Sequence, residues 1–98
     1  MKGFKYNLYL GRAYPGGEVT RGQFDRFIDQ EVMPRFCGCT ITDGLGYWKG
    51  ASERCWVLTI LDGAHLPGII ANIAKAYKTR FNQESVLIET IGNDIDFI

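Results

Sequence analysis

Apolar and polar residues alternate along residues 4–10, and this pattern predicts a strand with one buried face. The expected buried face comprises Phe4, Tyr6, Leu8 and Leu10, and the expected open face comprises Lys5, Asn7 and Tyr9. Residues 11–19 should follow as a loop, because Pro15, Gly16 and Gly17 are strong turn formers.

A helical periodicity begins after this loop. Thr20 and Gln23 have the spacing of a capping box, in which each side chain binds a backbone N–H group at the start of a helix. Pro34 should end the helix, because the residue before a proline is disfavoured in the helical conformation. The apolar residues between these limits recur at helical spacing, at Phe24, Phe27, Ile28 and Val32.

Residues 39–48 and 54–61 are predicted to be paired strands joined by a turn over residues 49–52. The first strand contains Gly44 and Gly46, which inside a strand indicate a bulge, a bend or the close approach of a ligand or another backbone. The second strand is largely apolar on both faces, which is typical of a central strand.

The last third of the chain predicts a helix and a strand. An apolar stripe runs from Leu66 to Phe81, with Pro67 suited to the first turn. Residues 84–91 are a predicted strand, and residues 92–98 are predicted to be a short edge strand or a packed tail. The whole order predicts an α+β fold, a ferredoxin-like βαββαβ sandwich with a four-stranded antiparallel sheet and both helices on one face.

Composition narrows the class of protein. A chain of 98 residues is the size of one domain, so we expect a single ferredoxin-like domain over residues 1–98. The 11 basic and 11 acidic residues cancel, which argues against nucleic acid binding. No apolar run reaches the length of a membrane span, and the basic start leads into a strand instead of a signal-peptide core. We therefore expect a cytoplasmic protein with no membrane partner.

The cysteines and the single histidine favour neither a disulfide framework nor a metal site. Cys37, Cys39 and Cys55 are an odd number, and zinc usually takes about four ligands, of which His65 is the only available imidazole. We interpret the cysteines as reduced, mostly buried side chains and predict no metal.

Candidate chemistry lies on the predicted hairpin. Tyr47 and Glu53 lie on opposite arms close to the turn, where side chains on paired strands come within reach of each other. A phenol and a carboxylate held together on a rigid hairpin could form a site. They could also be ordinary surface residues, and the sequence pattern leaves both readings open.

The uncovered sheet face should display several large side chains. We expect Tyr9 there, with one of Tyr47 and Trp48 and one of Trp56 and Val57. An exposed apolar face of this kind usually marks a partner. We therefore expect the chain to associate with copies of itself, and by analogy with other proteins of this fold ligands would bind between subunits.

Two blocks of sequence carry a family resemblance. The first includes residues 8–11 (Leu-Tyr-Leu-Gly), 15–18 (Pro-Gly-Gly-Glu) and 44–48 (Gly-Leu-Gly-Tyr-Trp), and the second is residues 81–87 (Phe-Asn-Gln-Glu-Ser-Val-Leu). Together they resemble a bacterial domain family of unknown function. This resemblance covers nearly the whole chain and implies a fold without an activity.

The order of elements is also similar to that of the phage-encoded S-adenosylmethionine lyases. That resemblance implies a homotrimer with active sites between subunits, which converts S-adenosylmethionine to methylthioadenosine and homoserine lactone without a cofactor. Carried onto this sequence, the catalytic residues would be Glu53 and Tyr47, and Trp48 could take the aromatic place instead.

Such a reaction needs few protein groups, because the substrate's own carboxylate attacks its γ-carbon as the sulfonium leaves. A water-poor pocket that folds the substrate would supply most of the catalysis. Glu53 would hold the ammonium group, and Tyr47 would position the substrate or face the sulfonium. Further substrate-binding groups would be the aromatic side chains of Trp48 and Tyr9 and the backbone N–H groups of Gly16 and Gly17.

The same residues are also consistent with a second function. The chain could be a non-enzymatic, oligomeric domain that binds a small ligand or a partner through its open sheet face.

Overall fold

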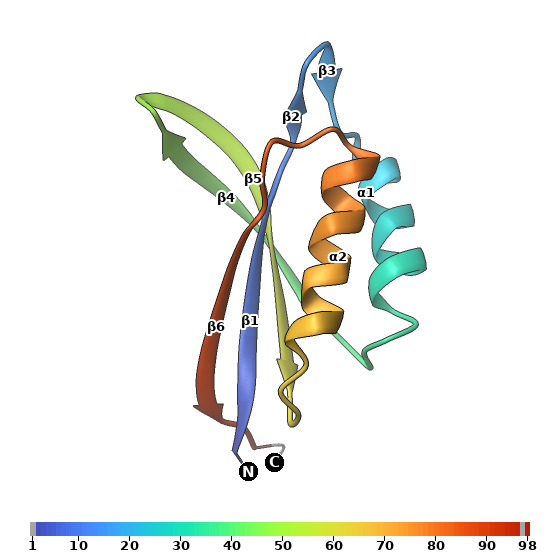
Figure 1. Ribbon diagram of the computed structural model, residues 1–98, viewed down its shortest axis with the longest axis vertical. Helices are drawn as coiled ribbons and strands as arrows, with labels where there is room; N and C mark the ends of the chain where they lie inside the picture. The colour runs from blue at the N-terminus through green and yellow to red at the C-terminus, as the bar shows by residue number, and fades with distance from the viewer. Residues whose placement is uncertain (1, 97) are drawn as a thin grey trace.

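Four strands form one antiparallel sheet, and two helices cover one of its faces (Figure 1). The computed structural model describes residues 2–96 and 98; Met1, Phe97 and the side chain of Trp48 lie outside that description. The sheet order β4-β5-β1-β6 confirms the expected ferredoxin-like α+β fold. The elements are β1 (Lys2–Gly11), β2 (Ala13–Tyr14), β3 (Gly17–Glu18), α1 (Arg21–Phe27), η1 (Ile28–Val32), β4 (Thr40–Trp48), β5 (Ala51–Asp62), α2 (Pro67–Arg80) and β6 (Leu87–Asp94).

The last strand differs most from its predicted bounds. β6 begins at Leu87, because residues 82–86 carry the chain from the helix layer to the sheet and start with a left-handed residue, Asn82 (φ 48°). The strand then continues to Asp94, which pairs with Lys2 at the other end of β1. Part of the expected tail is therefore the end of this edge strand.

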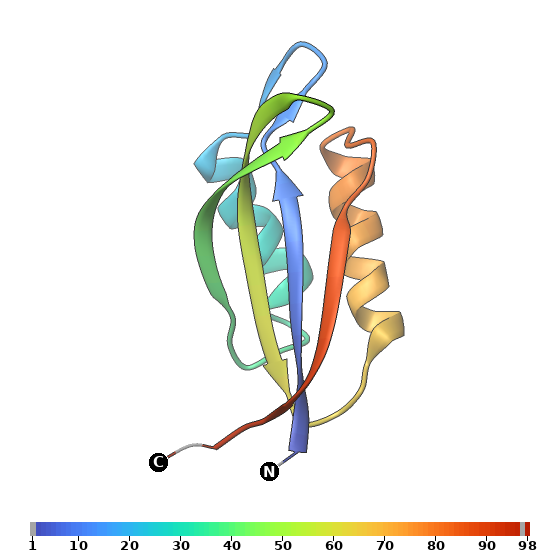
Figure 2. The same cartoon turned by 90° about the vertical axis from the view of Figure 1, so that its left-hand side faces the viewer.

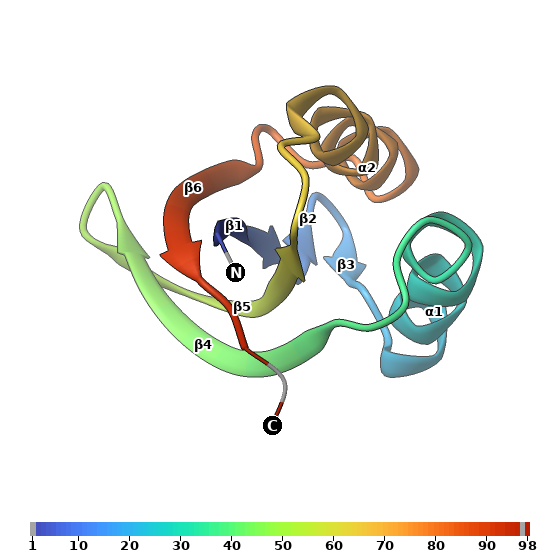
Figure 3. The same ribbon diagram turned by 90° about the horizontal axis from the view of Figure 1, so that it is seen from below.

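The face under the helices is a continuous apolar layer. Figure 3 shows both helices on the same side of the strands. The rings of Phe24 and Phe27 meet the ring of Tyr77 edge to face, with centroids 6.5 and 5.1 Å away, so aromatic contacts join α1 to α2. The strands contribute side chains that are at most 4% exposed, at Tyr6, Leu8, Leu10, Trp56, Leu58 and Ile60.

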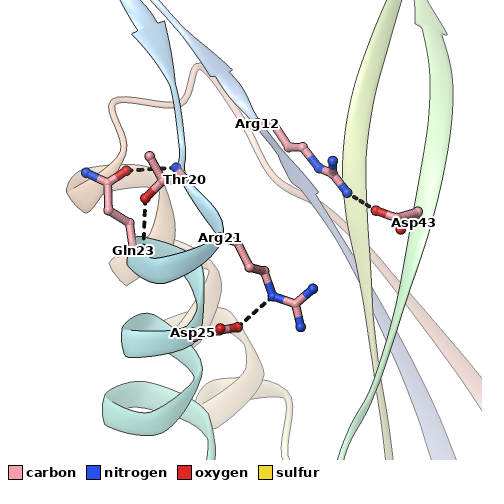
Figure 4. A network of polar contacts seen from close by, with 6 residues as sticks. All are labelled: Arg12, Thr20, Arg21, Gln23, Asp25 and Asp43. Atoms are coloured by element: carbon pink, nitrogen blue, oxygen red, sulfur yellow. Dashed lines mark hydrogen bonds and ion pairs between the residues drawn. The ribbon is translucent and has the colours of Figure 1, made fainter.

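The first helix begins at the predicted capping box. Thr20 Oγ1 accepts a hydrogen bond from the N–H of Gln23, and Gln23 Oε1 accepts one from the N–H of Thr20, at 3.1 and 2.9 Å (Figure 4). After Phe27 the helix widens into the π-helical turn η1, which the periodicity did not predict, and this turn ends before Pro34.

Trp56 lies in the helix-covered face. Its ring is stacked on Phe24 at 4.1 Å on one side, and the Arg12 guanidinium lies 4.1 Å from its centroid on the other. Arg12 also forms an ion pair with Asp43 of β4 (Figure 4). Of the two alternatives for the open face, Val57 is therefore the one found there.

Gly44 in β4 allows the close approach of a side chain from β5. Residues 40–48 pair with β5 in continuous register, without a bulge. A Cβ atom on Gly44 would stand only 3.0 Å from the sulfur of Cys55. The expected bulge is therefore absent from these paired residues, and the atom nearest Gly44 belongs to a side chain, where the expectation was a ligand or another backbone.

Candidate functional site

A groove with a volume of about 820 Å³ lies at one end of the uncovered sheet face. The end of β1 with the β2–β3 ribbon, the β4–β5 hairpin and the connection from α2 to β6 border it, and these parts meet at the upper end of the molecule in Figures 1 and 2. Sites for small molecules have volumes of about 300–1,000 Å³. The lining residues are Tyr9, Gly11, Ala13, Tyr14, Pro15, Gly46, Tyr47, Glu53, Cys55, Asn82, Gln83, Glu84, Ser85, Val86 and Leu87.

Two buried side chains fix the backbone at the floor of this groove. The hydroxyl of Tyr77 in α2 donates a hydrogen bond to the carbonyl of Gly11, at 2.6 Å. Burial raises the pKa of this hydroxyl above its ordinary value, so it remains a donor across the physiological range. The amide of Gln83 donates to the carbonyls of Ala13 and Phe81, at 2.9 and 3.1 Å. The end of β1 is therefore attached to the end of α2.

Glu53 points toward Gly11 on the open face. A Cβ atom added to Gly11 would stand 2.7 Å from Glu53 Oε1 and 2.6 Å from Gln83 Oε1. Both distances are too short for real neighbours, so only glycine at this position leaves the two oxygens where they are. The predicted site residue Glu53 thus lies in the groove, beside an oxygen that the sequence analysis did not single out.

Tyr47 and Glu53 lie on opposite arms of the β4–β5 hairpin, as expected, but they are not paired with each other. Gly46 is the residue paired with Glu53, and Tyr47 is paired with Ser52. Because side chains alternate between faces, those of Tyr47 and Glu53 leave opposite faces of the hairpin. The turn is only Lys49-Gly50 and not residues 49–52, and the pairing of residues 48 and 51 that closes it sets the register in which Gly46 lies opposite Glu53. Tyr47 borders the groove but is 75% exposed.

Of the other predicted substrate-binding residues, some line the groove and some do not. Tyr9 lies on the open face and lines the groove, as expected of an open-face residue. Gly16, with φ 97°, lies in the turn of the β2–β3 ribbon, and Gly17 begins β3. The groove is lined by their neighbour Pro15 instead. The side chain of Trp48 lies outside the described residues, so its role stays a prediction.

A polar network continues from the groove along the open face. The carboxylate of Glu89 accepts hydrogen bonds from Asn7 Nδ2 at 2.8 Å and from the Tyr9 hydroxyl at 3.2 Å. Thr59 donates to Asn7 Oδ1 at 2.7 Å, which extends the network to β5. The bonds from Asn7 and Tyr9 lower the pKa of Glu89. Burial, then the hydrogen bond and charge of Glu89, raise the pKa of Tyr9.

Cys55 lies in the groove wall next to Glu53. Burial raises the pKa of its thiol, and the negative charge of Glu53 raises it further, against an opposing effect of Arg12. The thiol is therefore mainly neutral near pH 7 and is a poor nucleophile. Among the described residues, no cluster of three or more His, Cys, Asp or Glu side chains is arranged to hold a metal ion.

The sequence analysis missed the contribution of Gln83 and Gly11. The signal available for both was their membership of the two sequence blocks that carry the family resemblance. Gln83 lies in the connection between α2 and β6, and its amide also orients a carbonyl oxygen into the groove.

The four-stranded sheet, the helices on one face and the groove define a ferredoxin-like α+β protein with a groove of small-molecule size. The model of the family described as "Protein of unknown function (DUF3574)" matches residues 5–97, and the chain belongs to that family. No curated protein matches the chain.

A solved structure has the same arrangement of elements. The chain is similar to a phage SAM lyase in complex with S-methyl-5′-thioadenosine, with a TM-score of 0.71 and 17% sequence identity over 91% of this chain and 80% of the lyase chain. At this identity the likeness establishes the shared fold.

None of the helices in the described residues is sufficiently long and apolar to span a bilayer.

Proposed function

We propose that this protein is a lyase that converts S-adenosylmethionine to methylthioadenosine and homoserine lactone. The observation that carries the proposal is the Glu53 carboxylate, which points toward Gly11 in a groove of about 820 Å³. The fold shared with a phage SAM lyase that was solved with a thioadenosine ligand adds support, as an analogy of fold.

The proposed reaction requires no nucleophile from the protein. A carboxylate oxygen of the substrate forms a bond to its γ-carbon, and the bond from that carbon to sulfur breaks. The electron pair of the broken bond stays on sulfur, which becomes the neutral thioether of methylthioadenosine, and no proton is transferred. Opposite charges cancel on the way to the transition state, so a groove that excludes water and holds the folded substrate accelerates the reaction.

Each proposed catalytic residue binds a charged part of the substrate. Glu53 accepts a charge-assisted hydrogen bond from the ammonium group. Tyr47 is on the opposite face of the hairpin, so it serves the reaction best in the groove of a neighbouring subunit, by positioning the substrate or facing its sulfonium. Trp48 is the alternative aromatic residue for this role. Tyr9, Gly16 and Gly17 complete the proposed substrate contacts.

We propose a homotrimer, because one chain leaves the groove open on the side away from its helices. Copies packed on the open face would close the groove and exclude water from it. No metal or cofactor takes part in the proposed reaction, and we place it in the cytoplasm, where its substrate is made.

The test measures methylthioadenosine formed from S-adenosylmethionine by the purified protein. We expect turnover by the wild type, and a decrease in kcat/KM of about ten- to a hundredfold for Glu53→Gln, because a hydrogen bond to a charged group contributes about 1.5–3 kcal/mol. Tyr47→Phe should also weaken turnover strongly. Glu18→Gln, an exposed glutamate of β3 that does not line the groove, is the matched control and should leave the rate unchanged.

The outcomes separate the two levels of the proposal. No turnover by concentrated wild-type protein would reject the lyase. Turnover with unchanged rates in Glu53→Gln and Tyr47→Phe would reject the residue assignment and leave the activity standing.

The alternative is a non-enzymatic domain that binds a ligand or partner. The hydrogen-bonded network around Glu89 on the open face favours it as the second candidate. Binding of methylthioadenosine without any turnover of S-adenosylmethionine would support this alternative.

A further inference from the structure

Two hydrogen-bond acceptors converge above one glycine in the groove. The Oε1 atoms of Glu53 and Gln83 both lie within 2.7 Å of the position that a Cβ atom of Gly11 would occupy. They come from elements far apart in the sequence, β5 and the connection from α2 to β6 (Figure 1). We call these two oxygens the acceptor pair.

The orientation of Gln83 is fixed by its other end. Its Nε2 atom donates to the carbonyls of Ala13 and Phe81, so the opposite atom of the amide must be the carbonyl oxygen. A flipped amide would place an acceptor against two carbonyl oxygens. Since Gln83 is only 9% exposed, solvent offers little compensation for that loss.

The acceptor pair has no donor of its own. In the part of the chain that the structure describes, no N–H or O–H group is hydrogen-bonded to the side-chain oxygens of Glu53 or to Oε1 of Gln83. Two acceptors that face the same point, one of them negatively charged, are complementary to a group that carries several donors and a positive charge.

We propose that the acceptor pair binds the primary ammonium group of an amino-acid-like ligand, and that Gln83 is a specificity-determining residue for this group. The identity of the ligand rests on the proposed function, in which the substrate carries an α-ammonium beside a carboxylate. Two of the three N–H donors of an ammonium group meet the acceptor pair, and the third remains for the rest of the ligand.

Other ligand groups fit the acceptor pair less well. A carboxylate or phosphate is repelled by Glu53 and finds no donor at this point. Calcium takes six to eight oxygen ligands and magnesium near-octahedral geometry, which a pair of oxygens does not supply. A neutral hydroxyl offers one donor and leaves the second acceptor unmatched.

The test compares two unreactive ligands that differ only in the ammonium group. These are S-adenosylhomocysteine and its deaminated analogue, in which hydrogen replaces the amino group and the carboxylate is retained. Calorimetric titration of the wild type should give at least about tenfold tighter binding of the amine. In Gly11→Ala the new methyl group separates the two oxygens, so this ratio should fall to near one while binding of the deaminated analogue changes little.

Two further variants keep the test decisive. Glu53→Gln retains the shape of an exposed side chain and should also lose the discrimination, which covers the case in which Gly11→Ala does not fold. Gly92→Ala in β6, where a Cβ atom meets no other atom within 4 Å, is the matched glycine control and should keep the wild-type ratio.

A ratio near one in the wild type, an unchanged ratio in both Gly11→Ala and Glu53→Gln, or binding of neither ligand would overturn the proposal. Turnover of S-adenosylmethionine is measured separately on the same samples. Turnover without discrimination would reject the proposed role of the acceptor pair but not the lyase activity. Discrimination without turnover would reject the lyase activity but not the role of the acceptor pair.

Discussion

At the scale of single residues, two glutamates on the same sheet face have different surroundings. Glu89 is bound by Asn7 and Tyr9, so its charge is already matched by donors of the protein. Glu53 faces Gln83 Oε1 across Gly11 and has no such donor among the described residues. We therefore expect Glu89 to contribute to stability, and we propose Glu53 as the glutamate that binds a ligand.

Glu89 should make the stability of the protein depend on acid pH. The pKa of Glu89 is lower in the native state than its ordinary value of 4.5. Its contribution to the free energy of unfolding is therefore complete above pH 4.5 and is lost as the pH falls through the lowered native pKa. We expect the wild type to exceed Glu89→Gln in free energy of unfolding at about pH 7, with the difference shrinking toward about pH 3.

Denaturant unfolding at the two pH values measures this difference. The exposed glutamate variant Glu18→Gln is the control and should give a difference that does not depend on pH in this way. A constant gap between wild type and Glu89→Gln at both pH values would contradict the assignment.

At the scale of elements, a hydroxyl of α2 holds the end of β1. Tyr77→Phe removes the hydrogen bond to the Gly11 carbonyl, in a side chain that is 0% exposed. A lost buried hydrogen bond should lower the free energy of unfolding by about 1–3 kcal/mol. Tyr47→Phe removes a hydroxyl from a 75% exposed side chain and should leave the stability unchanged when both are measured by chemical denaturation. Equal stabilities of the two variants would show that the Tyr77 bond contributes nothing.

The four main strands and the two α-helices were predictable from local patterns, whereas the β2–β3 ribbon and the π-helical turn η1 were not. Alternation along β1, the capping box at Thr20 and the apolar stripe of α2 each depend on residues close together in the chain. The turn of the β4–β5 hairpin was not predictable in this way. Its first residue, Lys49, adopts a left-handed conformation (φ 49°), which is uncommon for lysine. The short turn sets the register of the hairpin, in which Gly46 lies opposite Glu53.

The candidate site was predictable only in part for a related reason. Glu53 and Tyr9 were identified from strand positions and from resemblance. The contact between Gln83, Gly11 and Glu53 depends on three distant segments meeting at one point, which no local pattern records. The register of the sheet and the path of the chain after α2 had to be known before Gln83 could be assigned a role.

At the scale of the whole molecule, the open face carries exposed apolar side chains on both sides of its polar network. Leu61, Leu87 and Ile91 are 50%, 66% and 39% exposed. Apolar residues gathered on an uncovered sheet face favour burial against another chain. This distribution supports the proposed homotrimer.

Ile91→Glu should therefore shift the protein from the trimer toward the monomer, because the new charge would be buried in the subunit contact. Sedimentation velocity over a range of concentrations measures the change. Met33→Glu, at a 40% exposed position in the turn after η1, is the control and should remain associated. A wild type that sediments as a monomer at all concentrations would contradict the trimer.

The most direct measurement of the central claim is the reaction itself, run with S-adenosylmethionine in water enriched in oxygen-18. We expect methylthioadenosine and homoserine lactone, with no oxygen-18 in the ring oxygen bonded to the γ-carbon, because that oxygen comes from the substrate's own carboxylate. Label on that oxygen, or homoserine as the first product, would mean that water attacks and the groove is a hydrolase site. No methylthioadenosine at high protein concentration would contradict the account as a whole.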